Sequence, residues 1–96
     1  MSIDSDKLKE LEILISDRIY LQIQNWNLYL GDAGLSKSLA IECQANINKG
    51  VSIAARKACE AVEVNLGGGN TKVPLSNLIS SVQIFELEDL LNECLL

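Results

Sequence analysis

The sequence predicts an α+β fold that is mainly helical, with three or four helices and one β-hairpin. Three observations support this class. Apolar residues recur at steps of three and four over several stretches, which is the spacing of helices packed on a core. One stretch instead alternates apolar and polar residues, next to a triple glycine. The 96 residues fit a single domain spanning 1–96, and the apolar share of 48% is near the globular average.

The first helix is predicted from Ser5 to Leu30. Asp4 or Ser5 can cap it, and the apolar positions that follow are Leu8, Leu11, Ile15, Ile19, Ile23, Trp26 and Leu30. Ser16-Asp17 offers a point at which this helix can break into two, because both residues favour caps. Two glycines in the segment 31–34 then predict a turn.

Two further helices follow this turn. The second is predicted over residues 36–46, where Leu35, Leu39, Cys43 and Ile47 recur every four residues. Ser52 can cap the third, whose alanines allow close packing against a neighbouring helix.

A β-hairpin is predicted next. Val62, Val64 and Leu66 alternate with polar residues, the glycines supply the turn, and Lys72-Val73 begins the return strand before Pro74. The segment 74–79 is predicted as a short turn or one helical turn. Alternation at 82–84 leaves room for a third short strand, and the last helix is predicted over 86–94.

The net charge of −5 disfavours nucleic acid as a partner, since an acidic chain repels phosphates. No apolar run approaches the length of a membrane span, so we expect no membrane insertion. From residue 73 to 96 there is no lysine or arginine, while four acids fall there. This stretch is either a solvated helix face or an acidic docking surface for a partner, with candidate contacts at Glu86, Glu88 and Asp89.

The residue types disfavour catalysis. The chain has no histidine, which removes the commonest general base and the commonest transition-metal ligand. Its three cysteines, Cys43, Cys59 and Cys94, are odd in number and widely spaced, so we expect buried free thiols in a reducing cytoplasm. The first seven residues do not have the pattern of a signal peptide. We therefore expect that the chain is not an enzyme and that it binds neither a metal ion nor a cofactor.

Two features are candidates for contact. The glycines Gly67, Gly68 and Gly69 are explained by a hairpin turn that needs positive φ, or by a loop that holds an anion with Lys72 nearby. Trp26 and Tyr29 lie three residues apart, so in a helix they share a side. Trp26 falls on the core stripe, whereas Tyr29 lies off it and is the better contact candidate.

Three segments in order carry a family resemblance: Trp26-Asn27-Leu28-Tyr29-Leu30, the run from Val64 to Gly69, and the run from Val73 to Ile79. Together they resemble a family of short cyanobacterial proteins of unknown function. The resemblance implies a cytoplasmic protein of a photosynthetic bacterium. It implies no activity and no catalytic residue.

The function is unknown from sequence, and several hypotheses remain. The leading one is a small cytoplasmic interaction protein, an adaptor, assembly or regulatory factor, that binds a protein partner or itself. The alternative is a small module that binds an anionic ligand with its triple glycine. A subunit that donates an acid to a partner's active site, and an inhibitor that mimics an acidic surface, also stay open.

Overall fold

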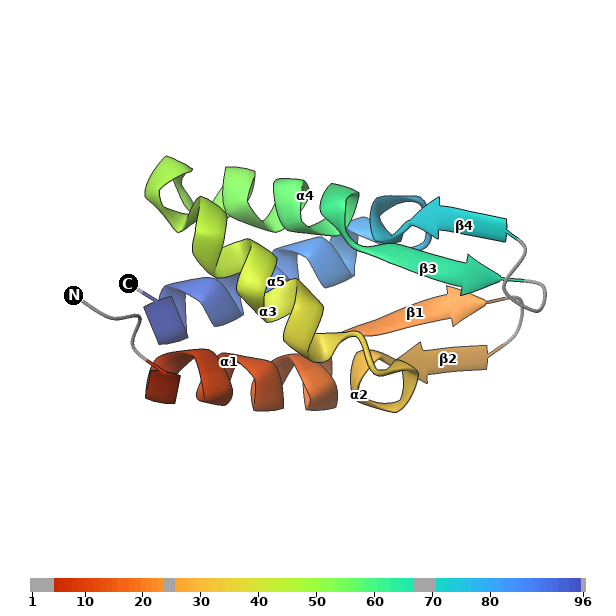
Figure 1. Ribbon diagram of the computed structural model, residues 1–96, viewed down its shortest axis with the longest axis horizontal. Coiled ribbons are helices and arrows are strands. Elements are labelled where there is room, and N and C mark those ends of the chain that lie inside the picture. Colours follow the sequence, from red (N-terminus) through yellow and green to blue (C-terminus); the bar gives the residue numbers. More distant parts are fainter. Residues whose placement is uncertain (1–4, 24–25, 67–70, 96) are drawn as a thin grey trace.

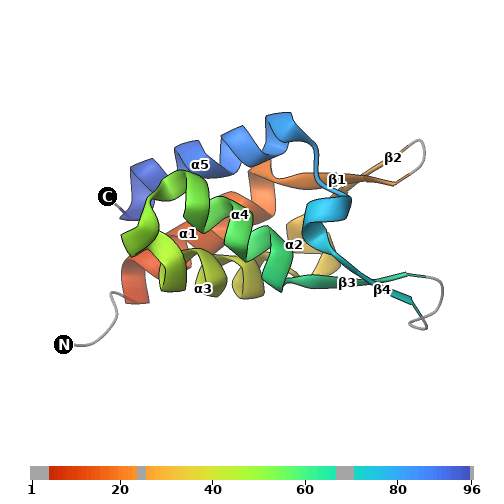
Figure 2. The same ribbon diagram turned by 90° about the horizontal axis from the view of Figure 1, so that it is seen from above.

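The computed structural model describes residues 5–23, 26–66 and 71–95, with the main chain alone for Ser5, Ile23, Trp26 and Leu66. The longer helices pack at one end of a molecule measuring 41 × 24 × 22 Å, and two β-hairpins project from the other end (Figure 1). The prediction of a mainly helical α+β fold is therefore confirmed. The hairpins are separate two-stranded sheets, and Figure 2 shows them splayed apart.

The predicted helix from Ser5 to Leu30 is wrong beyond its first half. Helix α1 spans Ser5–Arg18, and the chain then forms a hairpin from β1 (Tyr20–Ile23) and β2 (Trp26–Tyr29). These strands are antiparallel, with Tyr20 opposite Tyr29 and Leu21 opposite Leu28. A step of four residues fits both a helix turn and two strand repeats, so Ile15, Ile19 and Ile23 did not distinguish the two structures.

The predicted turn at 31–34 is a one-turn helix, α2 (Leu30–Ala33). Gly34 closes it with φ of 73°, a left-handed conformation that glycine adopts without a steric penalty. Gly31 lies so close to α1 that an added Cβ would stand 2.8 Å from Cβ of Ser16. A glycine at 31 thus permits the close approach of α2 to α1.

The next two helices follow the prediction closely. Helix α3 spans Ser36–Asn46, the short η1 spans Ile47–Lys49, and α4 spans Val51–Ala61. The start of α4 differs from the prediction, because Gly50 precedes the helix and Ser52 lies inside its first turn. Three alanines of α4 are fully buried, and α4 packs extensively against α3, as their small size allows: Ala54, Ala55 and Ala58.

The predicted hairpin is confirmed, with β3 at Glu63–Leu66 and β4 at Thr71–Pro74. Its strands are antiparallel, and Val64 lies opposite Val73. The alternation inferred from sequence is visible in the burial, since Val62 and Val64 are buried while Glu63 and Asn65 are exposed. The short helix η3 (Leu75–Asn77) then continues the chain, as one helical turn.

The third short strand at 82–84 is wrong, because this segment is the start of helix α5 (Ser81–Leu95). Oγ of Ser80 accepts a hydrogen bond from the main-chain N–H of Gln83 at 3.3 Å, which is the N-cap contact of a helix. The Gln83 side chain is buried, and its Oε1 accepts a bond from the main-chain N–H of Tyr20 at 3.0 Å. Gln83 thereby joins the first turn of α5 to β1.

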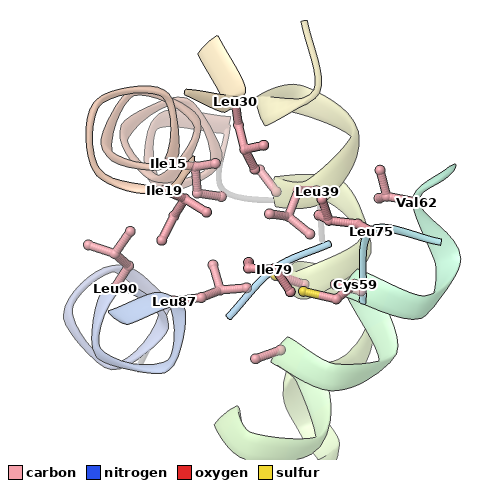
Figure 3. Close-up of a cluster of buried hydrophobic side chains, with 14 of the residues drawn as sticks. Ile15, Ile19, Leu30, Leu39, Cys59, Val62, Leu75, Ile79, Leu87 and Leu90 are labelled. Carbon is pink, nitrogen blue, oxygen red and sulfur yellow. The ribbon is translucent and has the colours of Figure 1, made fainter. Parts of the chain in front are cut away.

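One cluster of buried side chains joins the elements. Residues from α1, α3, α4 and α5 point toward one another in Figure 3, among them Ile15, Leu39, Cys59 and Leu87. Leu75 and Ile79 enter the same cluster from the segment between β4 and α5. Within the described ranges, no helix is both long enough and apolar enough to cross a membrane.

Candidate functional site

The surface between α4 and α5 carries an open hollow of about 280 Å³. We call it the α4–α5 hollow, and the residues lining it are Arg56, Ser81, Ile84, Phe85 and Glu88. Arg56 comes from α4 and the other four from α5. The two helices pack against each other, so the core contacts beneath fix the spacing of the side chains above.

The helical period of α5 places this hollow at the edge of the side that faces the core, where Ile84 is partly buried. Leu87, Leu90 and Leu91 are fully buried, whereas Ser81, Phe85 and Glu88 recur at steps of four and three residues on another side. The hollow is therefore a consequence of the helix that replaces the expected strand at 82–84.

Two large apolar side chains stand out of this surface. Phe85 is 64% exposed and Val82 is 71% exposed, and they lie three residues apart on α5. Residues at this spacing are neighbours on a helix, so the two side chains form one apolar knob beside the α4–α5 hollow. We call this pair the α5 knob. A knob and an adjacent hollow make a surface suited to contact with another molecule.

Opposite charges flank the hollow. Arg56 brings a guanidinium from α4, and Glu88 brings a carboxylate from α5. In the part of the chain that the structure describes, neither residue takes part in an ion pair. Both charges are therefore free to meet charges on a bound molecule, where water exclusion strengthens the pairing.

The predicted acidic surface on α5 divides into two parts. Glu86 and Glu93 approach Arg18 of α1, with Nη1 to Oε2 distances of 3.6 and 3.8 Å. These contacts tie α5 to α1 across a solvated surface and contribute little stability, because water and salt screen them. Glu88 belongs instead to the α4–α5 hollow, and Asp89 is exposed and is not among the residues that line it.

The predicted aromatic pair lies on the first hairpin. Both residues are in β2, so the argument that a helix places them on one side is wrong. Tyr29 is 39% exposed, and its ring stacks at a tilt of 55° on Tyr20, with 5.3 Å between centroids. The main chain of Trp26 pairs with Ile23, and its side chain lies outside the described residues.

The candidate anion loop is not placed by the structure. Gly67, Gly68 and Gly69 lie outside the described residues, and Lys72 is an exposed residue of β4 opposite Asn65. The hairpin on which they sit is confirmed, and their role in anion binding stays a prediction.

The three cysteines are free and buried, as predicted. Burial raises the pKa of the Cys59 thiol to about 12, with a smaller contribution from the charge of Glu60. Burial also raises the pKa of Cys43, as do the nearby Cys59 and Glu42. Thiols with raised pKa values are poor nucleophiles and poor ligands at neutral pH. No cluster of three or more metal-ligating side chains occurs within residues 5–23, 26–66 and 71–95.

Sequence reasoning missed most of the residues around the hollow. Arg56 was visible only as a small basic spot with Lys57, and Phe85 only as an aromatic residue before the expected helix. A signal was present in Ser80-Ser81-Val82-Gln83, which matches the S-x-x-Q pattern of a helix start. This pattern predicts that α5 begins near residue 81, and in a helix that begins there Phe85 lies off the side that faces the core.

The comparisons with known proteins support a family without an assigned activity. The family model described as a protein of unknown function (DUF3181) matches residues 8–94. No curated protein and no solved structure matches the chain. The matched range runs from α1 into α5 and includes both hairpins and every residue that lines the α4–α5 hollow. The chain therefore belongs to the DUF3181 family of proteins of unknown function.

Proposed function

We propose that this protein acts by binding a protein partner through the α4–α5 hollow and the α5 knob, and that it is not an enzyme. The observation that carries the proposal is the exposure of Phe85 and Val82 beside a hollow whose two charges have no ion-pair partner among the described residues. Aromatic side chains are frequent at the centres of protein interfaces, because they bury a large area at a small cost in side-chain entropy.

The chemistry of the surface defines the partner. The apolar part, formed by Ile84 and the α5 knob, matches an apolar side chain of the partner. Arg56 and Glu88 match an acidic and a basic group beside that side chain. A partner whose surface carries charges of only one sign would be repelled by either Arg56 or Glu88.

Residue types outside the site also support binding over catalysis. The chain has no histidine, and the hollow holds one carboxylate without a second acid or base across from it. General acid–base catalysis ordinarily uses such a pair with opposed roles. The surface is better suited to an adaptor, assembly or regulatory role.

We further propose that the protein works in the cytoplasm of a cyanobacterium. Buried free thiols are typical of proteins in a reducing compartment, and all three cysteines are of this kind. The cyanobacterial origin is supported by the resemblance of the segments around Trp26, Val64 and Val73.

Site-specific photo-crosslinking in the native host tests the proposal. A photoreactive phenylalanine analogue replaces Phe85 in one variant and Ile13 of α1 in the control. Ile13 is 61% exposed, which matches the 64% exposure of Phe85 on a different helix. We expect a discrete crosslinked protein from position 85 and none from position 13. No adduct at position 85, or the same adducts from both positions, overturns the proposal.

A further inference from the structure

We propose that the partner at this surface is a second copy of the same chain, so that two copies bind face to face across α4 and α5. The inference rests on the proposed function and adds the identity of the occupant. A pair related by a two-fold axis uses the same patch twice, so the patch must fit itself. The shape and the charge of this surface both meet that condition.

The shape is complementary to itself because a knob and a hollow lie side by side. Phe85 lines the α4–α5 hollow and is also 64% exposed, and Val82 extends the knob one helical turn away. A two-fold axis that runs along the hollow, between α4 and α5, places Phe85 of each copy over the α4 side of the other copy's hollow. Each Phe85 then loses its contact with water, which is the main source of affinity at such a centre.

The charges are also arranged for self-pairing. Arg56 lies on the α4 side of the hollow and Glu88 on the α5 side. The same two-fold axis, along the hollow between the two helices, reverses this order, so Arg56 of each copy faces Glu88 of the other. Two charges without ion-pair partners among the described residues thereby become two intermolecular pairs.

Other occupants fit the surface less well. A nucleic acid would be repelled by a chain of net charge −5. A strongly acidic partner would be repelled by Glu88, and a strongly basic partner would be repelled by Arg56. The same net charge makes two copies repel one another at long range. We therefore expect a small and reversible interface with a dissociation constant of roughly micromolar order.

Charge reversal with mixing tests the inference. Purified chains of wild type, R56E and E88R are followed by sedimentation equilibrium over a range of concentrations. We expect the wild type to dimerise and each single variant to associate about tenfold more weakly, since two pairs become repulsive. A mixture of R56E with E88R restores association. In the mixed pair, position 56 of each chain faces position 88 of the other, and the two positions again carry opposite charges.

Matched controls separate the effect of a charge at position 56 or 88 from the effect of the net charge of the chain. K57E makes the same charge change as R56E on the neighbouring residue of α4, and E63R makes the same charge change as E88R on an exposed residue of β3. Both controls are outside the lining of the hollow and leave association within about twofold of the wild type. Phe85→Ala weakens association by about thirtyfold or more, as expected for a central aromatic residue.

Several results overturn the inference. They are a wild type that stays monomeric throughout, a mixture no more associated than its components, and a K57E variant as weak as R56E. Mass spectrometry of the adduct from position 85 separates the two proposals. An adduct between two copies supports both, whereas an adduct with a different protein keeps the proposed function and overturns the self-pairing. No adduct overturns the proposed function itself.

Discussion

Single residues determine how closely the elements approach. Gly31 is an example, because a side chain there would collide with Ser16 at a Cβ separation of 2.8 Å. The neighbouring Ser16 and Ser36 hydroxyls form a hydrogen bond of 2.8 Å, which satisfies a buried polar group between α1 and α3. Small and hydrogen-bonded residues thus occupy the junction at which α1, α2 and α3 meet.

Because the thiols are buried, the free energy of unfolding decreases at alkaline pH. The pKa of Cys59 is raised from 9.0 to about 12, so the folded state favours the neutral thiol. The contribution of this group is complete below about pH 9 and is lost as the pH rises toward 12. We expect the free energy of unfolding to fall by about 1.4 kcal/mol for each pH unit and thiol in this window.

Urea unfolding at a series of pH values measures this fall. Cys59→Ala removes one titrating thiol, so its stability decreases less steeply with pH than that of the wild type. Cys94→Ala serves as a comparison, since the pKa of Cys94 is also raised by burial. Equal slopes for the wild type and Cys59→Ala would contradict the assignment.

At the scale of elements, one buried amide connects two segments far apart in the sequence. Gln83 in the first turn of α5 accepts a hydrogen bond from the main-chain N–H of Tyr20 in β1. Ser80 caps the same turn. The start of α5 and the first hairpin therefore support one another, and the hairpin gains stability that two strands alone lack in water.

Replacing Gln83 with methionine tests this connection. Methionine keeps the length of the side chain and removes the acceptor, which leaves the N–H of Tyr20 unsatisfied. We expect a loss of about 1–3 kcal/mol in the free energy of unfolding. Hydrogen exchange at the amide of Tyr20 should accelerate more than exchange at Leu39, which lies in α3. Unchanged exchange at Tyr20 would show that the bond does not support the hairpin.

At the scale of the whole molecule, the core and the α5 knob use opposite sides of one helix. Leu87 is fully buried in the common cluster, whereas Phe85, two residues earlier, is largely exposed. Apolar surface that remains in water adds little to the stability of a single chain. The exposed side of α5 is therefore available for binding without a cost to folding.

Two alanine variants separate these roles. Phe85→Ala should change the free energy of unfolding by no more than about 0.5 kcal/mol. Leu87→Ala should lower it by about 2–5 kcal/mol, because it leaves a cavity in the core. Chemical denaturation of dilute protein measures both values, so that association does not contribute. A Phe85→Ala variant as unstable as Leu87→Ala would mean that Phe85 belongs to the core.

The limits of sequence reasoning appear most clearly between Ile19 and Leu30. Steps of three and four residues predicted a helix there, although Ile19 and Leu21 also fit alternation and are both buried. The two runs on either side of Gln24-Asn25 have the spacing of a hairpin. The same residues fit both the helical and the strand period. The hydrogen bond from the main chain of Tyr20 to Gln83 and the ring contact of Tyr20 with Tyr29 agree with the strand.

The sequence by itself determined the features that depend on neighbours along the chain. These are the helix at 36–46, the hairpin around the triple glycine, the burial of the thiols and the acidic charge. Periodicity and turn residues act over a few residues, so the order of side chains is enough to predict them. The family resemblance belongs to the same level.

Only the tertiary structure decided which distant residues share a surface. Arg56 and Glu88 belong to different helices, and no local pattern relates them. Their proximity results from the packing of α4 against α5, which depends on the volumes of the buried side chains beneath. The candidate site follows from the same packing, because the core fixes where each helix lies and thus which side chains remain outside.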